Sequence, residues 1–146
     1  MDKDKAECRF VWVRMKVLFV CSGNAHRSPL AEALLKKLRS DLDVDSAGIH
    51  VAIPVSEEAK KFLAEDDAAQ YLKRVPENLG SKQLSEYDLI VAMEQRHKDA
   101  VLNRCPDCED KIVVWNIEDP YFLPPENAER IYKQIKEKVE ELAASL

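Results

Sequence analysis

Residues 16–30 of this 146-residue chain read KVLFVCSGNAHRSPL in one-letter code. After the leading lysine come five apolar residues, which is typical of a strand buried on both faces. The turn signal Ser22-Gly23-Asn24 ends that strand. Apolar residues recur at helical spacing over residues 30–38, and we expect Ser28 to cap this helix and Pro29 to lie in its first turn. The stretch therefore predicts a strand, a tight loop and a helix.

The remainder of the chain alternates between short apolar runs and helical patterns. Further strands are predicted at residues 43–48, 88–93 and 111–115. Helices are predicted at residues 56–72, at 95–102 and around 131–142, and prolines make 119–125 a loop. Solid apolar strands that alternate with helices favour an α/β fold, a three-layer sandwich with a central four-stranded parallel sheet and helices on both faces.

Composition limits the classes of protein to consider. The net charge is −5, and charged residues make up 34% of the chain, above the roughly 25% of an average globular protein. The acidic balance disfavours a nucleic-acid partner and a polybasic membrane contact, and the longest apolar run is too short to span a bilayer. Four cysteines are too sparse for a secreted disulfide scaffold. We expect a cytoplasmic monomer, and the excess of Lys and Glu points weakly to a heat-adapted source.

The chain length suits a single closed core. We expect one domain over residues 15–146, preceded by an N-terminal extension over residues 1–14 that contains Cys8. The apolar segment 10–13 either lengthens the first strand or belongs to the extension, and the pattern leaves both open. The start of the chain lacks the apolar region of a signal peptide.

The loop after the first strand carries the strongest chemical signal. In an open parallel sheet, ligands bind beyond the carboxyl ends of the strands, where a helix N-terminus presents free N–H groups to an anion. Arg27 adds a planar fork for two phosphate oxygens. Cys21 lies where these groups converge, and such surroundings favour a thiolate. A buried, inert Cys21 with Arg27 at the surface is the alternative, but the coincidence of strand, turn and helix start favours a nucleophile in an oxyanion cradle.

This loop and its flanks resemble the signature of the low-molecular-weight protein tyrosine phosphatases. The segments Asp45-Ser46-Ala47-Gly48, Asp88-Leu89-Ile90-Val91-Ala92-Met93 and Asp119-Pro120-Tyr121 match further family segments in the same order. The resemblance covers about residues 15–145. We expect the sheet order 2-1-3-4, with Cys21 at the point where the order reverses.

The resemblance implies roles for individual residues of the loop. Cys21 would attack phosphorus and carry a cysteinyl-phosphate intermediate, and Ser28 would donate a hydrogen bond to its thiolate. Asn24 would support the loop through an unusual backbone angle, and Ser46 would brace it from the second strand. The residues that would bind the phosphate oxygens, through backbone N–H groups and the guanidinium, are Ser22, Gly23, Asn24, Ala25, His26 and Arg27.

The reaction also needs an acid, because an alkoxide or phenoxide is a poor leaving group unless it is protonated. The resemblance implies that Asp119 is this acid and then the base for the attacking water. An isolated Asp-Pro is more often a simple turn, and the neighbouring Glu118 competes for the assignment. Tyr121 and Phe122 would form a wall for an aromatic substrate, although a core position for Phe122 is nearly as well supported.

Three positions depart from the family pattern. His26 replaces a second loop cysteine found in many members; we expect its ring to point to solvent rather than to promote the Cys21 thiolate. Ala25 stands where a Thr accompanies phosphoarginine substrates in the family, which disfavours that substrate. The connector around Leu79 lacks a His that some members use to brace the loop, and no specificity residue can be assigned within residues 49–54.

Cys105 and Cys108 form a lone Cys-x-x-Cys pair, which is a weak zinc signal. Two inert thiols are the default expectation, with a redox pair or a short disulfide as alternatives. Arsenate reductases of the same fold pass a disulfide from the loop cysteine to two further cysteines. The first of these relay cysteines would lie near Met93, a mismatch that makes thiol-coupled arsenate reduction the second hypothesis.

Together with the loop chemistry, the resemblance thus implies a protein tyrosine phosphatase that needs no cofactor and no metal. Its expected partners are a phosphotyrosine protein or a small aryl phosphate, with inorganic phosphate or sulfate able to fill the loop, and neither nucleic acid nor membrane. A non-catalytic phosphate-binding or redox-sensing module is the third and weakest hypothesis.

Overall fold

The computed structural model describes residues 14–146 of the chain. Its helices and strands, in chain order, are β1 (Lys16–Cys21), α2 (Arg27–Leu38), β2 (Asp43–Gly48), α3 (Glu57–Glu65), β3 (Leu89–Ala92), α4 (Gln95–Arg104), β4 (Ile112–Val114) and α5 (Asn127–Ser145). Short 3-10 turns connect several of them. The predicted extension and the segment 10–13 lie outside the described residues, apart from Arg14, and the proposed domain boundary at residue 15 stays a prediction.

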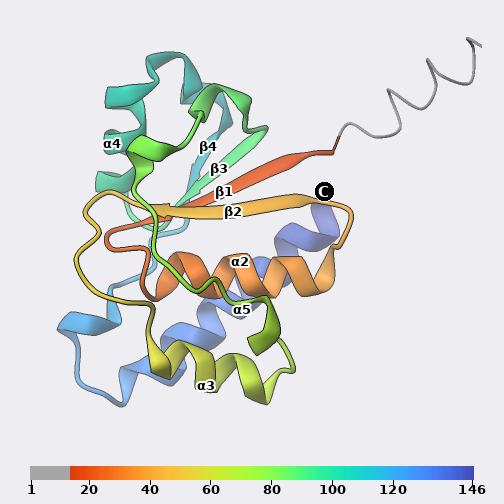
Figure 1. The fold of residues 1–146 in the computed structure, drawn as a ribbon, viewed down its shortest axis with the longest axis vertical. Coiled ribbons are helices and arrows are strands. Elements are labelled where there is room, and N and C mark those ends of the chain that lie inside the picture. Colours follow the sequence, from red (N-terminus) through yellow and green to blue (C-terminus); the bar gives the residue numbers. More distant parts are fainter. Residues whose placement is uncertain (1–13) are drawn as a thin grey trace, which may run out of the picture.

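The sheet has four parallel strands in the order β2-β1-β3-β4, which confirms the predicted topology. Central strand β1 pairs with β2 on one side and β3 on the other, with Cys21 opposite Gly48 in register. The order of strands reverses at β1, so its carboxyl end, where Cys21 lies, opens onto the position at which α/β sheets bind ligands. Figure 1 shows β1 and β2 running side by side above α2.

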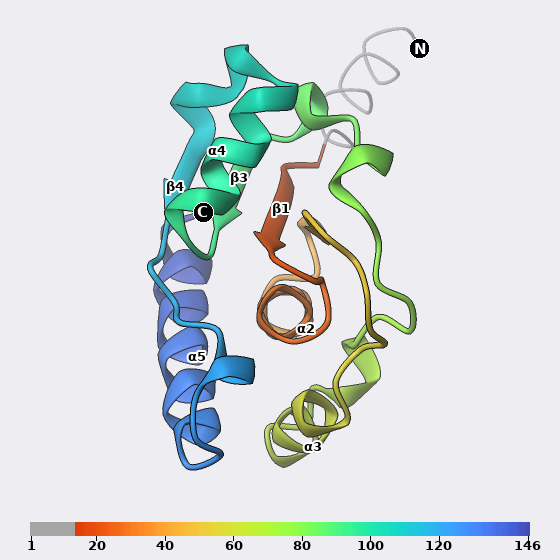
Figure 2. The same cartoon turned by 90° about the vertical axis from the view of Figure 1, so that its left-hand side faces the viewer.

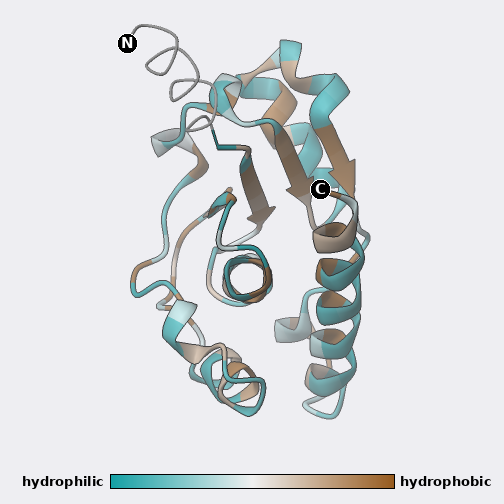
Figure 3. Cartoon of the chain, turned by 90° about the vertical axis from the view of Figure 1, so that its right-hand side faces the viewer, coloured by the Kyte–Doolittle hydropathy of each residue, from teal (hydrophilic) through white to brown (hydrophobic). Residues whose placement is uncertain are grey.

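Helices cover both faces of the sheet, as predicted (Figures 1 and 2). On one face, α2 and α5 pack on the side of β1 that carries Val17 and Phe19. On the other face, α4 packs on the side that carries Leu18 and Val20. Successive strand residues point to opposite faces, so a strand with a core on both sides must be apolar throughout. Figure 3 shows this as hydrophobic strands between helices with hydrophilic outer faces.

Two helix predictions need correction. The helix predicted over residues 56–72 ends at Glu65, because Asp67 adopts a left-handed backbone conformation with φ 55° that no α-helix can continue through. Helix α2 begins at Arg27 with His26 at its N-cap and has no side-chain cap, so Ser28 is not its capping residue, although Pro29 does lie in the first turn. The Ser28 hydroxyl instead contacts Cys21.

Within residues 14–146, no helix combines the length and the apolar character needed to cross a lipid bilayer.

Candidate active site

The loop between β1 and α2 places Cys21 at the base of a cavity of about 720 Å³. The loop continues directly into the N-terminus of α2 (Figure 2), so the free N–H groups of the first helical turn lie next to the loop. Cys21 is buried but lines the cavity, together with Ser22, Arg27 and Asp119. The structure therefore brings the predicted nucleophile, anion-binding arginine and acid to one place.

Asn24 supports the loop from inside. It is fully buried with a φ of 52°, a conformation that Asn tolerates better than most residues. Its Oδ1 accepts hydrogen bonds from Lys73 Nζ and the Glu77 backbone N–H, both at 2.8 Å. Its Nδ2 therefore has to be the donor, and it lies 2.9 Å from both Ser28 Oγ and Ser46 Oγ. This amide fixes the direction of the hydrogen bonds around the loop.

Ser28 Oγ lies 2.9 Å from Cys21 Sγ. Because Ser28 Oγ already accepts a hydrogen bond from Asn24, its own proton is free for the sulfur. A hydroxyl donor aimed at the sulfur can stabilise negative charge there when the sulfur acts as a leaving group. Lys73, which anchors the Asn24 amide, was not identified from the sequence; it lies in an irregular connector that offers no pattern.

Gly48 ends β2 directly beneath the loop. A Cβ added there would lie 2.7 Å from both Asn24 N and Gly23 C, which is closer than carbon can approach backbone atoms. Gly48 is thus required for the close packing of the loop on β2.

Gly48→Ala is expected to displace the loop, because its new methyl group meets backbone rather than a flexible side chain. We expect the free energy of unfolding to fall by roughly 1–3 kcal/mol and kcat/KM toward an aryl phosphate to fall at least about tenfold. Urea unfolding and steady-state kinetics measure the two effects. The matched control is Gly80→Ala, whose added Cβ would have the end of the flexible Arg104 side chain as its nearest neighbour, at 3.2 Å, instead of backbone; equal effects in the two variants would refute this explanation.

Arg27 is buried at the base of the cavity and held in place on one side. Its Nη1 donates to Glu94 Oε1 and to the Ile117 carbonyl, both at 2.7 Å. Its Nη2 lies at the cavity, 3.2 Å from Ser22 Oγ and 3.4 Å from Asp119 Oδ2. Fixing one amino group leaves the guanidinium plane oriented for an anion bound at the loop.

Glu94 was missed by the sequence analysis, although a carboxylate directly after a buried parallel strand is a recognisable signal. Partial burial raises the pKa of Glu94, but hydrogen bonds from Arg27 and Arg96 outweigh burial and hold that pKa below its ordinary value. Glu94 therefore stays charged and keeps Arg27 paired.

Asp119 reaches the cavity from the segment after β4. One carboxylate oxygen accepts the Tyr121 backbone N–H at 3.0 Å, which begins the 3-10 turn Pro120–Phe122. The neighbouring Glu118 pairs with Arg130 at 3.2 Å and does not line the cavity. Of the two candidate acids, Asp119 is thus the one placed to reach a substrate.

The mouth of the cavity has two walls. Tyr121 and Phe122 form one wall, with 75% and 77% of each residue exposed and their rings 5.2 Å apart, edge to face. The alternative of a core position for Phe122 is therefore wrong. The other wall comes from the segment for which the sequence offered no assignment, and its lining residues include Ile49, His50, Ala52, Ile53 and Pro54. The mouth is largely apolar and aromatic, whereas the base is polar.

His26 does not point to solvent as expected. Its Nε2 is buried and has no hydrogen-bond partner among the described residues, and the ring lies near Asp119 and Arg27 on the cavity lining. Burial lowers the pKa of His26 to about 4, against a smaller opposing effect of Asp119. The ring is therefore neutral at physiological pH and supplies no positive charge to Cys21.

His97 was also missed by the sequence analysis. It lies in the first turn of α4 and is fully buried. Its Nδ1 accepts the Glu94 backbone N–H at 3.0 Å, and its Nε2 lies 2.9 Å from Ser22 Oγ. Burial, and then the charges of Arg27 and Arg96, lower the pKa of His97 to about 4.

The two buried histidines predict a loss of stability in mild acid. An unfolded histidine takes up its proton near pH 6.5, whereas His26 and His97 do so only near pH 4 when folded. Their contribution is therefore complete above about pH 6.5 and is lost as the pH falls toward 4. We expect unfolding free energy to fall by at least about 1 kcal/mol per histidine between neutral pH and about pH 5.

Urea titrations at the two pH values measure this difference. His97→Gln should reduce the pH dependence, whereas His50→Gln, at an exposed position, should leave it unchanged. An equal pH dependence in wild type and His97→Gln would contradict the assignment.

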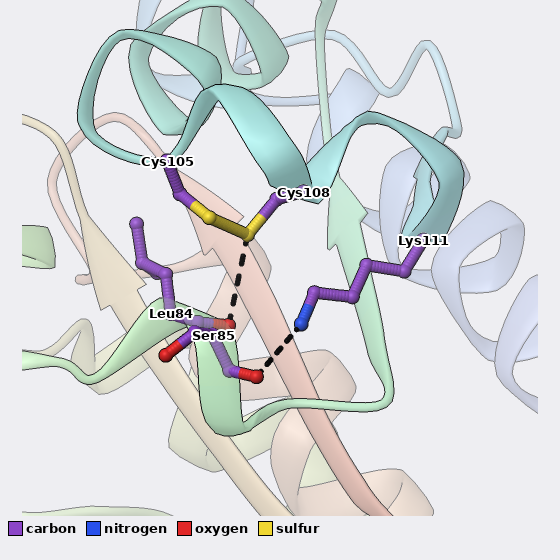
Figure 4. Close-up of a disulfide and its surroundings, with 5 residues drawn as sticks. All are labelled: Leu84, Ser85, Cys105, Cys108 and Lys111. Carbon is purple, nitrogen blue, oxygen red and sulfur yellow. Dashed lines mark hydrogen bonds between the residues drawn. A yellow bond between two sulfur atoms is a disulfide. The ribbon is translucent and has the colours of Figure 1, made fainter.

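Cys105 and Cys108 form a disulfide, so the default expectation of two inert thiols is wrong (Figure 4). The bridge closes the turn after α4, where Cys108 is buried and its Sγ lies 3.8 Å from the Leu84 carbonyl. Beside it, Lys111 Nζ donates a hydrogen bond to the Ser85 carbonyl. The ten residues of α4, about 15 Å of helix, separate the bridge from the active-site end of α4. Among residues 14–146, Cys21 is the one free cysteine. The position at which an arsenate reductase of this fold would carry its first relay cysteine is the buried Met93, which cannot pass on a disulfide.

Removing the bridge is expected to lower stability without changing activity. For so short a loop, the double variant Cys105→Ala/Cys108→Ala should lose about 2 kcal/mol of unfolding free energy and keep its kcat/KM toward an aryl phosphate. Urea unfolding under oxidising conditions and steady-state kinetics check both points. Thioredoxin-dependent arsenate turnover that disappears in this variant would instead support the reductase hypothesis.

The family model described as "Low molecular weight phosphotyrosine protein phosphatase" matches residues 16–146. The chain is 30% identical to the low molecular weight protein-tyrosine-phosphatase Wzb of Salmonella typhi, over 90% of this chain and 93% of the relative. It is 31% identical to the protein-arginine-phosphatase of Bacillus subtilis, over 90% and 94% of the two chains. The relatives thus include phosphatases named for two different phosphorylated residues.

Among solved structures, Vibrio vulnificus Wzb in complex with benzylphosphonate superposes with a TM-score of 0.82 at 30% identity, covering 92% of this chain and all of that one. The family match spans nearly all of the described residues, and the fold with its sheet order agrees with it. The chain belongs to the low-molecular-weight protein tyrosine phosphatase family and is a phosphatase.

Proposed function

We propose that this phosphatase hydrolyses phosphotyrosine in proteins through a cysteinyl-phosphate intermediate on Cys21. The observation that supports this most directly is the convergence of Cys21, Arg27 and Asp119 on the base of one cavity whose mouth carries two exposed aromatic rings. Phosphoryl transfer depends mainly on positioning and charge stabilisation, and the proposal is supported by the presence of the residues of the proposed cradle around one cavity. We propose that inorganic phosphate or sulfate occupies the same cradle.

In the first step, the loop N–H groups and Arg27 hold the three non-bridging oxygens of the phosphoryl group. The Cys21 thiolate donates an electron pair to phosphorus, and the bond from phosphorus to the tyrosine oxygen breaks. Asp119 gives its proton to that oxygen as the bond breaks, so tyrosine leaves as a neutral phenol. The products of this step are a cysteinyl phosphate and an Asp119 carboxylate.

In the second step, the Asp119 carboxylate takes a proton from a water molecule as the water oxygen attacks phosphorus. The sulfur–phosphorus bond breaks and its electron pair returns to Cys21, where the Ser28 hydroxyl stabilises the thiolate through the 2.9 Å contact. Inorganic phosphate leaves, and Asp119 again carries the proton required for the next cycle.

The two walls of the cavity support tyrosine over arginine as the phosphorylated residue. Tyr121 and Phe122 offer ring surfaces and Ile53 and Pro54 an apolar surface, which together suit a flat phenyl ring. Ala25 lacks the hydroxyl of the Thr that accompanies phosphoarginine substrates in this family. The Vibrio vulnificus Wzb complex holds benzylphosphonate, a compound with an aromatic ring joined to a phosphorus group, and we propose that this chain binds its substrate ring in the same cavity.

The test compares a phosphotyrosine peptide with a phosphoarginine peptide of the same sequence, in the presence of EDTA. We expect kcat/KM to be at least about tenfold higher for phosphotyrosine, since a poorly matched group in an apolar pocket loses roughly this much. Activity should persist in EDTA, because the proposed mechanism uses no metal. A preference for phosphoarginine would overturn the substrate assignment while leaving the phosphatase intact, and loss of activity in EDTA would overturn metal independence.

A further inference from the structure

The side chain of Ser22 lies on the cavity lining with two polar neighbours. His97 Nε2 is 2.9 Å from Ser22 Oγ, and Arg27 Nη2 is 3.2 Å from it. The direction of the hydrogen bond with His97 depends on which ring nitrogen carries the proton, and the surrounding contacts settle that question.

The other ring nitrogen of His97 decides the tautomer. The Glu94 backbone N–H points at His97 Nδ1 from 3.0 Å, and a backbone N–H can only donate. Nδ1 must therefore be unprotonated. In a neutral imidazole the remaining proton is then on Nε2, so His97 donates to Ser22 Oγ and Ser22 accepts. Full burial of the ring holds this arrangement in place.

Arg27 is the second donor to the same oxygen, since a guanidinium has no acceptor. With both lone pairs of Ser22 Oγ receiving hydrogen bonds, the hydroxyl proton has to point away from His97 and Arg27. We propose that this proton is directed into the cavity and donates to a non-bridging oxygen of the bound phosphoryl group, with His97 as the positioning residue. The inference rests on the proposed function, because it assumes that the cavity binds phosphate.

This donor would add to the loop N–H groups and Arg27 in a specific way. A serine hydroxyl normally rotates among several partners, whereas here two fixed donors remove that freedom before substrate binds. Donors oriented in advance toward an oxygen that gains charge usually make the largest single contribution to catalysis. Ser22 would thus bind phosphate in the resting enzyme and stabilise the transferring group during reaction.

Binding of inorganic phosphate to the full chain, measured by isothermal titration calorimetry, tests the proposal without requiring turnover. Ser22→Ala should weaken phosphate binding about tenfold, because one hydrogen bond to a charged group contributes roughly this much. Ser22→Thr keeps the hydroxyl and should stay close to wild type. The value of kcat/KM toward p-nitrophenyl phosphate should fall in parallel in Ser22→Ala and be restored in Ser22→Thr.

His97→Phe separates positioning from general structural support through a double-mutant cycle. In the protein that retains Ser22, His97→Phe should weaken phosphate binding. In the Ser22→Ala variant, where the hydroxyl is already gone, it should have no further effect on binding. If His97→Phe does not fold, His97→Leu, which also lacks a donor, replaces it in the cycle, and urea unfolding checks each variant.

The outcomes distinguish the inference from the function on which it rests. Unchanged phosphate affinity in Ser22→Ala, or additive effects of the two substitutions, would overturn the role of Ser22 or of His97, respectively. Phosphate binding that depends on Ser22 in a protein inactive on phosphotyrosine would support the donor and overturn only the proposed function.

Discussion

Cys21→Ser is expected to lower kcat toward p-nitrophenyl phosphate by at least about 10⁴-fold. A serine hydroxyl at this position is a far weaker nucleophile than a thiolate, and Ser28 Oγ, the atom 2.9 Å from the sulfur, is arranged as a donor rather than as a base. Steady-state kinetics over a range of enzyme concentrations, with the product followed by its absorbance, measure the loss.

Two controls show that the loss is chemical. Cys21→Ser should still bind inorganic phosphate, because the loop N–H groups and Arg27 are unchanged. The double variant Cys105→Ala/Cys108→Ala removes two other sulfur atoms and should remain active. A Cys21→Ser enzyme that retains a kcat within about tenfold of wild type would rule out covalent catalysis by Cys21.

Asp119→Asn is expected to slow the enzyme by an amount that depends on the leaving group. General acid catalysis contributes roughly 10²–10⁴-fold, and a leaving group of high pKa needs the proton most. We therefore expect a loss near the upper end of that range for a phenyl or alkyl phosphate and a much smaller loss for p-nitrophenyl phosphate. Plots of log kcat/KM against the pKa of the leaving alcohol should be steeper for the variant.

Glu118→Gln is the matched control, since it neutralises the adjacent carboxylate, which pairs with Arg130 away from the cavity. It should leave both the rate and the leaving-group dependence unchanged. Equal losses for all leaving groups in Asp119→Asn would remove Asp119 as the acid and assign it a role in holding Arg27, to which it lies 3.4 Å away.

The fold was predictable because its determinants are local. The unbroken apolar run of β1 follows from burial on both faces, and the same apolar pattern in β3 and the short β4 identifies two more strands of the sheet. The loop from Ser22 to His26 was recognisable for the same reason, since strand, turn and helix start are adjacent in sequence. The end of α3 was not predictable, because the left-handed conformation of Asp67 leaves no pattern in the neighbouring apolar spacing.

The residues that surround the loop were harder to find because they come from distant segments. Lys73 reaches Asn24 across 49 positions and His97 reaches Ser22 across 75, so only the folded chain shows these contacts. Glu94 carried a usable signal, as the carboxylate at the end of the third strand. The orientation of His26 depends on how its ring packs against the cavity lining, which residue type alone does not determine.

The measurement that tests the central claim most directly is the capture of the phosphorylated enzyme. Asp119→Asn should form the intermediate from p-nitrophenyl phosphate, whose leaving group needs little protonation, and should hydrolyse it slowly because the base for water is missing. Rapid acid quenching followed by peptide mass spectrometry should then find one phosphoryl group on the peptide with Cys21, at the thiol, and none at the same quench times in the Cys21→Ser/Asp119→Asn variant. A phosphoryl group on any other residue, or none on Cys21 during turnover, would contradict the mechanism.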